Sequence, residues 1–111
     1  MGKQKDDHKN IVHYIEANWN RGITLKSVST KFRRDPSDME RIVREETGMT
    51  FHENIELRRK ARLEELLRRG ERVGIGIAKE LGIPGARAFY QWVPRAYGIA
   101  FTQLRKQYDT S

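Results

Sequence analysis

The sequence predicts an all-α protein of about seven helices, arranged as two similar halves that share one long helix. Three observations lead to this prediction. Apolar residues recur at helical spacing through most of the chain, a stretch of good helix formers occupies its middle, and the pattern of residues 28–51 returns 49 to 50 positions later. The 111 residues divide into a first subdomain at 8–49, a connector helix at 50–69 and a second subdomain at 70–108.

The connector helix is predicted from its two ends. Thr50 and Glu53 form a capping-box pattern at its start, and no Pro or Gly follows until Gly70, which suits the position just after a helix. Apolar residues on one side are Ile55, Leu63, Leu66 and Leu67, and those nearly opposite are Leu57 and Ala61. Apolar groups on two sides favour packing against two partners, whereas burial within one bundle is the alternative.

The first half contains three predicted helices. The first covers about 8–20, after a polar segment at 1–7 that we expect to be disordered or a frayed helix start. Thr24 is the expected N-cap of a short second helix. The third runs from Pro36 to Thr47 and ends at Gly48. The buried stripes are Ile11, Tyr14, Ile15 and Trp19, then Leu25, Val28 and Phe32, then Met39, Ile42 and Val43.

The second half repeats this arrangement with weaker helix signals. A helix from Val73 to Leu81 has a loose first turn, because glycine lowers helix stability by about 1 kcal/mol relative to alanine. The next helix begins near Pro84, and its internal Pro94 predicts a kink or an end near Val93. A short terminal helix is expected at 102–107. Phe89 and Trp92, like Trp19, have the spacing of core residues rather than of base-stacking platforms.

Composition narrows the class of partner. The chain has 22 Lys and Arg residues against 15 Asp and Glu residues, a net charge of +7, which favours nucleic acid first and an anionic membrane second. No cysteine is present, and no apolar run approaches the length of a membrane span. The histidines His8, His13 and His52 are dispersed and lack metal-ligand spacing. We therefore expect a cytoplasmic protein that is not an enzyme and has no metal or cofactor.

The internal repeat predicts a function. Val28, Ser29 and Phe32 match Ile77, Ala78 and Leu81 at an offset of 49, and Met39, Ile42, Val43, Gly48 and Phe51 match Phe89, Trp92, Val93, Gly98 and Phe101 at an offset of 50. Each half is thus a helix, a short turn, a helix and a glycine. This is the helix-turn-helix arrangement, in which the second helix enters the major groove of DNA.

The same segments resemble the DNA-binding region of the AraC/XylS family of bacterial transcription regulators. The resemblance covers about residues 9–106 and includes Arg58 at the family's linker-helix arginine, with the segments YIEANWNRGITLKSVS, MERIVREETGMTF, IAKELGI, AFYQWV and YGIAFTQLR. It implies two three-helix, homeodomain-like helix-turn-helix subdomains on one connector. The departures are Arg33 at a usual turn glycine, Arg34, Glu64, Gln91, Val93, Pro94, Ala100 and Phe101.

The resemblance also assigns roles to side chains. Base-facing positions are Ser37, Glu40 and Arg41 in the first half and Ala86, Arg87 and Gln91 in the second. Phosphate contacts are expected from Arg33, Arg34, Arg44 and Arg95. Arg41 and Arg87 lead among the base readers, because arginine pairs bidentately with guanine. For the arginines, a solvated helix face is the alternative role. If the family geometry holds, a monomer reads two successive major grooves.

The function expected from these observations is regulation of transcription through double-stranded DNA, in the bacterial cytoplasm at the nucleoid. The resemblance implies an activator that recruits RNA polymerase. The chain looks like the short stand-alone members, without a small-molecule ligand, or like an excised domain. An alternative is a protein-interaction module that antagonises another regulator and keeps the fold without base reading. A third is an amphipathic membrane binder, against which the dispersed basic residues speak.

Overall fold

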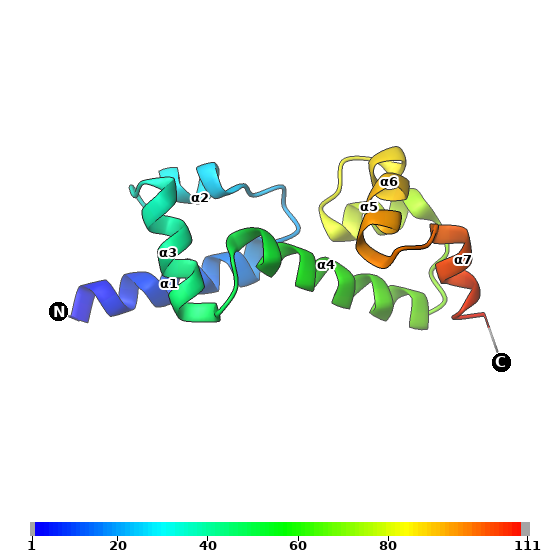
Figure 1. Ribbon diagram of the computed structural model, residues 1–111, viewed down its shortest axis with the longest axis horizontal. Coiled ribbons are helices and arrows are strands. Elements are labelled where there is room, and N and C mark those ends of the chain that lie inside the picture. The colour runs from blue at the N-terminus through cyan, green and yellow to red at the C-terminus, as the bar shows by residue number, and fades with distance from the viewer. Residues whose placement is uncertain (1, 110–111) are drawn as a thin grey trace. The chain divides into compact units, whose positions relative to one another are not determined.

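The computed structural model describes residues 2–109, with side chains from Asp7 onward. In this range the chain consists of helices joined by short turns (Figure 1). The described residues form seven α-helices and no strand, which confirms the predicted fold class. In chain order they are α1 (Gly2–Asn18), α2 (Leu25–Lys31), α3 (Pro36–Thr47), α4 (Phe51–Arg68), α5 (Gly74–Leu81), α6 (Ala86–Tyr97) and α7 (Phe101–Lys106).

The chain forms two compact units, and the boundary lies inside α4 between Leu57 and Arg58. The first turns of α4 contribute Phe51 and Ile55 to the core of the first unit. Further along α4, in the second unit, the buried side chains are Leu63, Leu66 and Leu67. Leu57 is 52% exposed and Ala61 is also exposed, so the prediction that an opposite apolar face of this helix packs against a partner is wrong. The helix belongs to two cores through its two ends instead.

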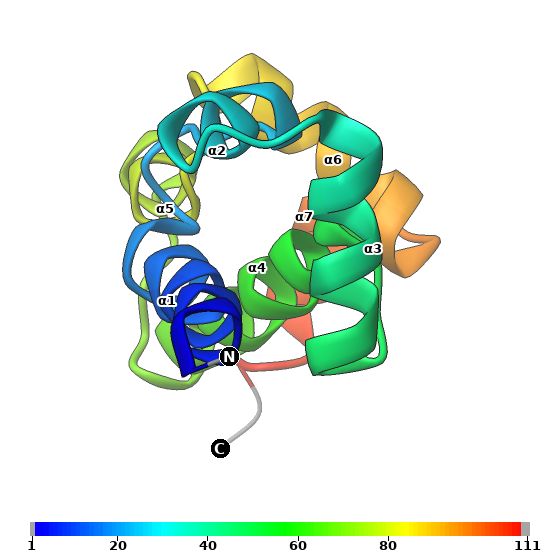
Figure 2. The same ribbon diagram turned by 90° about the vertical axis from the view of Figure 1, so that its left-hand side faces the viewer.

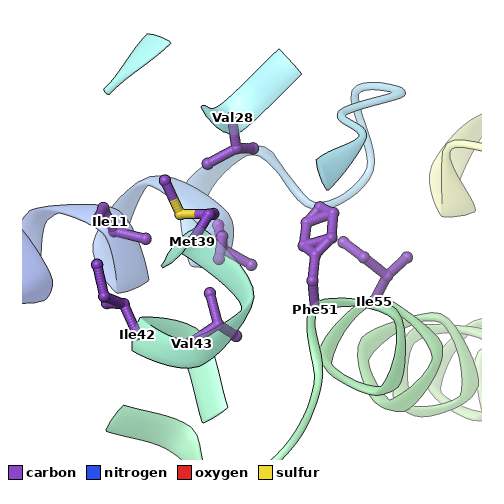
Figure 3. Packing of buried hydrophobic residues seen from close by; sticks show 8 residues of the cluster. Ile11, Val28, Met39, Ile42, Val43, Phe51 and Ile55 are labelled. Atoms are coloured by element: carbon purple, nitrogen blue, oxygen red, sulfur yellow. The ribbon is translucent and has the colours of Figure 1, made fainter. Parts of the chain in front are cut away.

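The core of the first unit lies where α3 packs against α1 and α2. Figures 1 and 2 show α3 crossing α1 steeply, with α2 above α1. Figure 3 shows how Ile11 of α1, Val28 of α2 and Met39 of α3 meet in this core. Its buried members are Ile11, Ile15, Val28, Met39, Ile42, Val43, Phe51 and Ile55. Partly buried Tyr14, Trp19, Ile23, Leu25 and Phe32 pack around them, as the predicted stripes require.

The ends of the first-unit helices follow from local hydrogen bonds. Thr24 caps α2, because its Oγ1 accepts the Ser27 amide at 3.0 Å. The predicted Thr50 and Glu53 capping box is present: Thr50 Oγ1 accepts the Glu53 amide at 3.0 Å, and Glu53 Oε1 accepts the Thr50 amide at 2.9 Å. Gly48 ends α3 in the left-handed conformation with φ of +77°. These caps place α2, α3 and α4 where the sequence predicts them.

Helix α1 differs from its prediction at its first residue. It begins at Gly2 rather than near His8 and ends at Asn18, within two residues of the expected end. A physical reason is visible at Asp7, whose carboxylate forms an ion pair with Arg34 at 2.6 Å. This long-range contact ties the first turns of α1 to the turn before α3. Met1 lies outside the described residues.

The second unit has an aromatic core. The Phe89 ring lies edge-on to Phe101 with centroids 4.9 Å apart and stacks with Trp92 at 6.3 Å. Trp92 in turn meets the Tyr97 ring edge-on at 6.1 Å. Tyr97 anchors α6 to α4, because its hydroxyl donates to a Glu64 carboxylate oxygen at 3.1 Å. The interpretation of Phe89 and Trp92 as core residues is therefore confirmed.

Of the two effects predicted for Pro94, a kink or a helix end near Val93, the end is wrong, because α6 continues through Pro94 to Tyr97. Proline lacks the amide that would donate to the Tyr90 carbonyl one turn earlier. Both Pro94 and Tyr90 are exposed, so this part of the helix faces solvent, which can supply the missing donor. The helix then ends at Gly98, whose amide donates to the Pro94 carbonyl at 2.8 Å. Its start, at Ala86, is two residues after the expected Pro84.

Candidate nucleic-acid interface

The two helix-turn-helix motifs have the same turn geometry. In the first, the Arg34 amide donates to the Ser29 carbonyl at 2.9 Å. In the second, 49 residues later, the Ile83 amide donates to the Ala78 carbonyl, also at 2.9 Å. The residue before each donor is left-handed, with φ of +55° at Arg33 and +71° at Gly82. The repeat seen in the sequence is therefore a repeat of backbone conformation.

Arg33 holds a conformation that ordinarily belongs to glycine. Among the described residues it alone combines a positive φ with a side chain. Its Cβ crowds the backbone there, at a cost of roughly 1–2 kcal/mol. This conformation leaves the Arg33 side chain exposed at the turn directly before α3. Within residues 7–109, Arg33 forms no ion pair. A guanidinium at this turn is placed to meet an anion.

Helix α3, predicted to be the first recognition helix, carries the predicted base-facing residues on its outer side. Ser37 and Arg41 are exposed, and Glu40 is half-buried. Arg44, predicted to contact phosphate, is exposed one turn later, without an ion pair among the described residues. Arg41 and Arg44 follow Ser37 at intervals of about one and two turns, so the three side chains share a broad face of the helix.

Glu40 has a structural contact that the sequence does not reveal. Its Oε1 accepts the backbone amide of Phe51, the first residue of α4, at 2.6 Å. The first amides of a helix have no partner within the helix, and a carboxylate there also interacts favourably with the helix dipole. Glu40 therefore caps α4 across eleven residues of sequence. Reading a cytosine would require this carboxylate to leave the Phe51 amide.

Arg34 and Arg41, predicted for phosphate and base contacts, belong to one ionic network. Arg34 pairs with Asp7 at 2.6 Å and with Asp38 at 2.8 Å. Arg41 pairs with the other oxygen of Asp38 and with Glu45 at 3.0 Å. Hydrogen bonds from Arg41 and then Arg34 lower the pKa of the Asp38 carboxyl below its ordinary value. The network places counter-charges beside two of the cations expected to meet DNA.

Part of this ionic network follows from spacing, and part does not. The Asp38, Arg41 and Glu45 side chains are three and four residues apart on one helix, the separations at which neighbouring side chains meet. A search for such pairs in the predicted α3 finds them. Asp7 is 27 residues from Arg34, and only the packing of α1 beside the turn brings the two together.

Helix α6, predicted to be the second recognition helix, presents a different surface. The predicted base readers Arg87 and Gln91 are exposed, and Ala86 is half-buried. No ion pair involves Arg87 within the part of the chain whose side chains are described. Arg95, predicted for phosphate, is exposed and donates from Nε to the Gln91 carbonyl at 3.3 Å. Its guanidinium remains without a carboxylate partner over the same range.

Tyr90 is the exposed residue of α6 that the sequence analysis missed. It lies 48% exposed between Phe89 and Gln91, and its ring packs at 5.8 Å from Phe101. A Cβ built on Gly74 would overlap the Tyr90 hydroxyl and lie 2.7 Å from its Cζ, so the phenol occupies the space beside that glycine. Tyr90 stands 50 positions after Glu40, and this offset is the signal that could have drawn attention to it.

The described residues form neither a metal site nor a membrane span. No group of three or more His, Cys, Asp or Glu side chains in the described chain is arranged to hold a metal ion. Among the described helices, none is both long and apolar enough to span a membrane.

The fold is shared with solved DNA-binding domains. The C-terminal domain of AraT, a response regulator from Geobacillus stearothermophilus, aligns with a TM-score of 0.80 and 24% identity over 95% of this chain and 88% of that one. A DNA-binding transcriptional dual regulator from Escherichia coli K-12 aligns with a TM-score of 0.67 and 18% identity, over 92% of this chain and 91% of its own.

An AraC-type DNA-binding domain protein from Chromobacterium violaceum, a transcriptional regulator, aligns with a TM-score of 0.64 and 15% identity. The alignment covers 99% of this chain and 98% of that one. No protein-family model and no curated protein sequence matches the chain. The resemblance stated from the sequence is thus confirmed in three dimensions: the chain has the fold of an AraC-type DNA-binding domain.

Proposed function

We propose that this protein is a transcription regulator that binds double-stranded DNA as a monomer and reads two successive major grooves with α3 and α6. The observation that supports it most is the duplicated helix-turn-helix, with equal turn hydrogen bonds of 2.9 Å and a recognition helix exposed after each turn. The solved proteins of the same fold are described as DNA-binding or transcriptional regulators, which supports the same conclusion.

Within this proposal the side chains divide by chemistry. Base edges are read by Ser37, Glu40 and Arg41 on α3 and by Ala86, Arg87 and Gln91 on α6. Phosphates are contacted by Arg33, Arg34, Arg44 and Arg95. Arg87 and Arg41 have the bidentate geometry that suits guanine, and Gln91 suits adenine. Arg33, Arg44 and Arg87 are exposed without carboxylate partners in the described structure, so they reach DNA without first breaking an ion pair.

The action that follows is regulation of transcription in the bacterial cytoplasm, at the nucleoid. We further propose that the protein activates by recruiting RNA polymerase, with no small-molecule ligand. A reporter gene placed behind a selected binding site tests the sign of regulation. Expression that rises with the abundance of the protein supports an activator, whereas expression that falls identifies a repressor.

DNA binding itself is tested by fluorescence anisotropy with a labelled duplex of random sequence across a salt series. Each phosphate neutralised by Lys or Arg releases counterions, so the logarithm of the affinity falls linearly with the logarithm of salt, with a slope of about −0.9 per contact on duplex DNA. Selection of bound sequences from a random pool follows. Two half-sites about 34 Å apart, one helical turn, are expected if both recognition helices dock; one half-site would contradict two-groove reading.

A second candidate function is a protein-interaction module that keeps the fold without reading bases. The observation that favours it is the state of α3, where Glu40 caps α4 and Arg41 is held between Asp38 and Glu45. The same anisotropy experiment separates the two functions. Absence of binding to any duplex at low salt supports the interaction module and rejects DNA binding.

A further inference from the structure

We propose that the second unit, through the basic face of α6, supplies most of the attraction of this protein for DNA, because acidic residues of the first unit offset the charge of its arginines. This inference rests on the proposed function and specifies how the two units share it. The net charge of the chain is +7. Up to Leu57 there are ten Lys and Arg residues against ten Asp and Glu residues, whereas from Arg58 onward there are twelve against five. The whole excess of positive charge therefore belongs to the second unit.

The two recognition helices show the same contrast at equivalent positions. Helix α3 has four acidic and two basic residues, and α6 has two basic residues and no acidic one. At an offset of 50 residues, Ala88 replaces Asp38, Tyr90 replaces Glu40 and Arg95 replaces Glu45. The net charges are therefore −2 for α3 and +2 for α6. A helix inserted in the major groove lies between two rows of phosphates, so this difference acts directly on binding.

The ionic contacts of the first unit increase this difference. Arg34 has its counter-charges in Asp7 and Asp38, and Arg41 has its own in Asp38 and Glu45. To contact a phosphate, each of these guanidinium groups must exchange a carboxylate oxygen for a phosphate oxygen. Such an exchange replaces one ion pair by another and gains little. Arg34 and Arg41 are thus largely neutralised before DNA binds.

The carboxylates of the second unit contact groups other than the guanidinium groups of Arg87 and Arg95. Glu65 and Glu80 pair with Arg62 of α4, and Asp109 pairs with Arg72. Glu64 accepts the Tyr97 hydroxyl, and Glu71 precedes α5. None of these acidic residues is part of α6 or of α7, and α7 itself carries Arg105 and Lys106 in its last turn. Arg87 and Arg95 on α6 consequently keep their charge available.

The experiment compares two pairs of substitutions that each remove two arginines from one helix-turn-helix. The variants are Arg87→Ala with Arg95→Ala in the second unit and Arg34→Ala with Arg41→Ala, the two arginines of the ionic network, in the first. Binding to random duplex DNA is followed by anisotropy from 50 to 200 mM salt. On random DNA, where Arg87 has no matched guanine and contacts a phosphate as Arg95 does, loss of the two contacts reduces the salt slope by about 1.8 and the affinity at 0.1 M salt by roughly 60-fold. We expect this loss for the second-unit pair and less than a 10-fold loss for the first-unit pair.

Equal losses for both pairs, or a larger loss for the first-unit pair, would overturn the assignment. The charge-retaining variant Arg87→Lys with Arg95→Lys should keep the wild-type slope, and thermal unfolding followed by circular dichroism identifies any variant that has lost its fold. If wild-type protein binds no duplex at low salt, the proposed function itself fails. That result is distinguishable from unequal or equal losses, which are defined only when wild type binds.

A gain-of-affinity variant tests the role of the ionic network directly. Asp38→Asn removes the carboxylate that Arg34 and Arg41 share, whereas Glu46→Gln removes an exposed carboxylate of the same helix that belongs to no ion pair among the described side chains. Both variants gain one unit of positive charge. Because Arg34 keeps Asp7 and Arg41 keeps Glu45, we expect Asp38→Asn to raise affinity for random duplex DNA at 0.1 M salt by more than Glu46→Gln does, but by less than the roughly eightfold of one new phosphate contact. If affinity increases no more for Asp38→Asn than for Glu46→Gln, the ion pairs of Arg34 and Arg41 do not reduce DNA binding.

Discussion

The Tyr90 phenol packs beside Gly74, in the space that a side chain on Gly74 would occupy. The equivalent pair in the first unit is Leu25 and Glu40, in which the larger apolar group stands on the first helix of the motif. In the second unit the Tyr90 ring fills, from α6, the space beside the first residue of α5. Gly74 therefore has a packing role in addition to its low helix propensity, because the Tyr90 ring occupies the space that a side chain at position 74 would fill.

A double-mutant cycle on Gly74 and Tyr90 should detect this contact. Gly74→Ala alone should displace the half-exposed Tyr90 ring, so the gain from a better helix former is lost. In a Tyr90→Ala background the same change should raise the free energy of unfolding by about 0.5–1 kcal/mol, the usual advantage of alanine over glycine in a helix. Urea unfolding of the four proteins measures the coupling. A coupling energy of zero would contradict the packing of the ring on Gly74.

Replacing Arg33 by glycine should stabilise the first unit. The φ of +55° at Arg33 crowds its Cβ, and glycine relieves this at the expense of a more flexible unfolded chain. The expected net gain in unfolding free energy is about 0.5–1 kcal/mol. Arg33→Ala is the control, since alanine retains the Cβ and should gain nothing. Equal stability of the two variants would argue against backbone strain at this turn.

Removing the Glu40 carboxylate should weaken the start of α4. Glu40→Ala deprives the Phe51 amide of its 2.6 Å partner, and loss of such a cap lowers the free energy of unfolding by about 0.5–2 kcal/mol. Glu46→Ala changes an exposed glutamate on the same helix and should leave stability within about 0.5 kcal/mol of wild type. Thermal unfolding of both variants, followed by circular dichroism at 222 nm, checks the difference. Equal losses of stability for Glu40→Ala and Glu46→Ala would show that the hydrogen bond from the Phe51 amide to Glu40 does not stabilise the protein.

Base reading should be separable from phosphate binding by comparing specific and random DNA. Arg41→Ala and Arg87→Ala should each relax sequence preference by roughly 1–3 kcal/mol, the value of a bidentate contact with guanine. Arg44→Ala should weaken specific and random duplexes alike. Competition binding with the sequence selected from a random pool provides the measurement. Equal losses on both duplexes for Arg41→Ala and Arg87→Ala would show that these two residues contact only the backbone of DNA.

The ionic network around Asp38 should make stability of the first unit depend on acid pH. Arg41 and Arg34 lower the folded-state pKa of Asp38 below its ordinary value near 3.8, so the folded state holds its proton less tightly than the unfolded chain. The stabilising contribution is therefore complete above that ordinary value and is lost as pH falls through the lowered folded value. Unfolding of wild type and Asp38→Asn from pH 6 to pH 2 should show a stability difference that shrinks toward acid. A difference that stays constant would exclude this contribution.

Much of the architecture could be read from the residues in order. Helix periodicity, the Thr50 and Glu53 cap and the glycines after α3 and α6 are local features, and a local feature acts through neighbours that the sequence already shows. The exposed faces of α3 and α6 follow from their buried stripes in the same way. The repeat also relates the two turns, since Arg33 and Gly82 occupy equivalent positions and both adopt the left-handed conformation.

Contacts between residues distant in sequence could not be predicted from the sequence and are seen only in the folded structure. Asp7 meets Arg34, Glu40 caps Phe51 and Tyr90 covers Gly74 only because separate helices pack together. The same holds for Pro94, whose effect on α6 depends on which side of the helix faces water. Helix periodicity and capping depend on residues that are close in sequence, so the sequence specifies where helices form. The charge that each helix-turn-helix leaves free for DNA depends on distances across the core, which only tertiary packing sets.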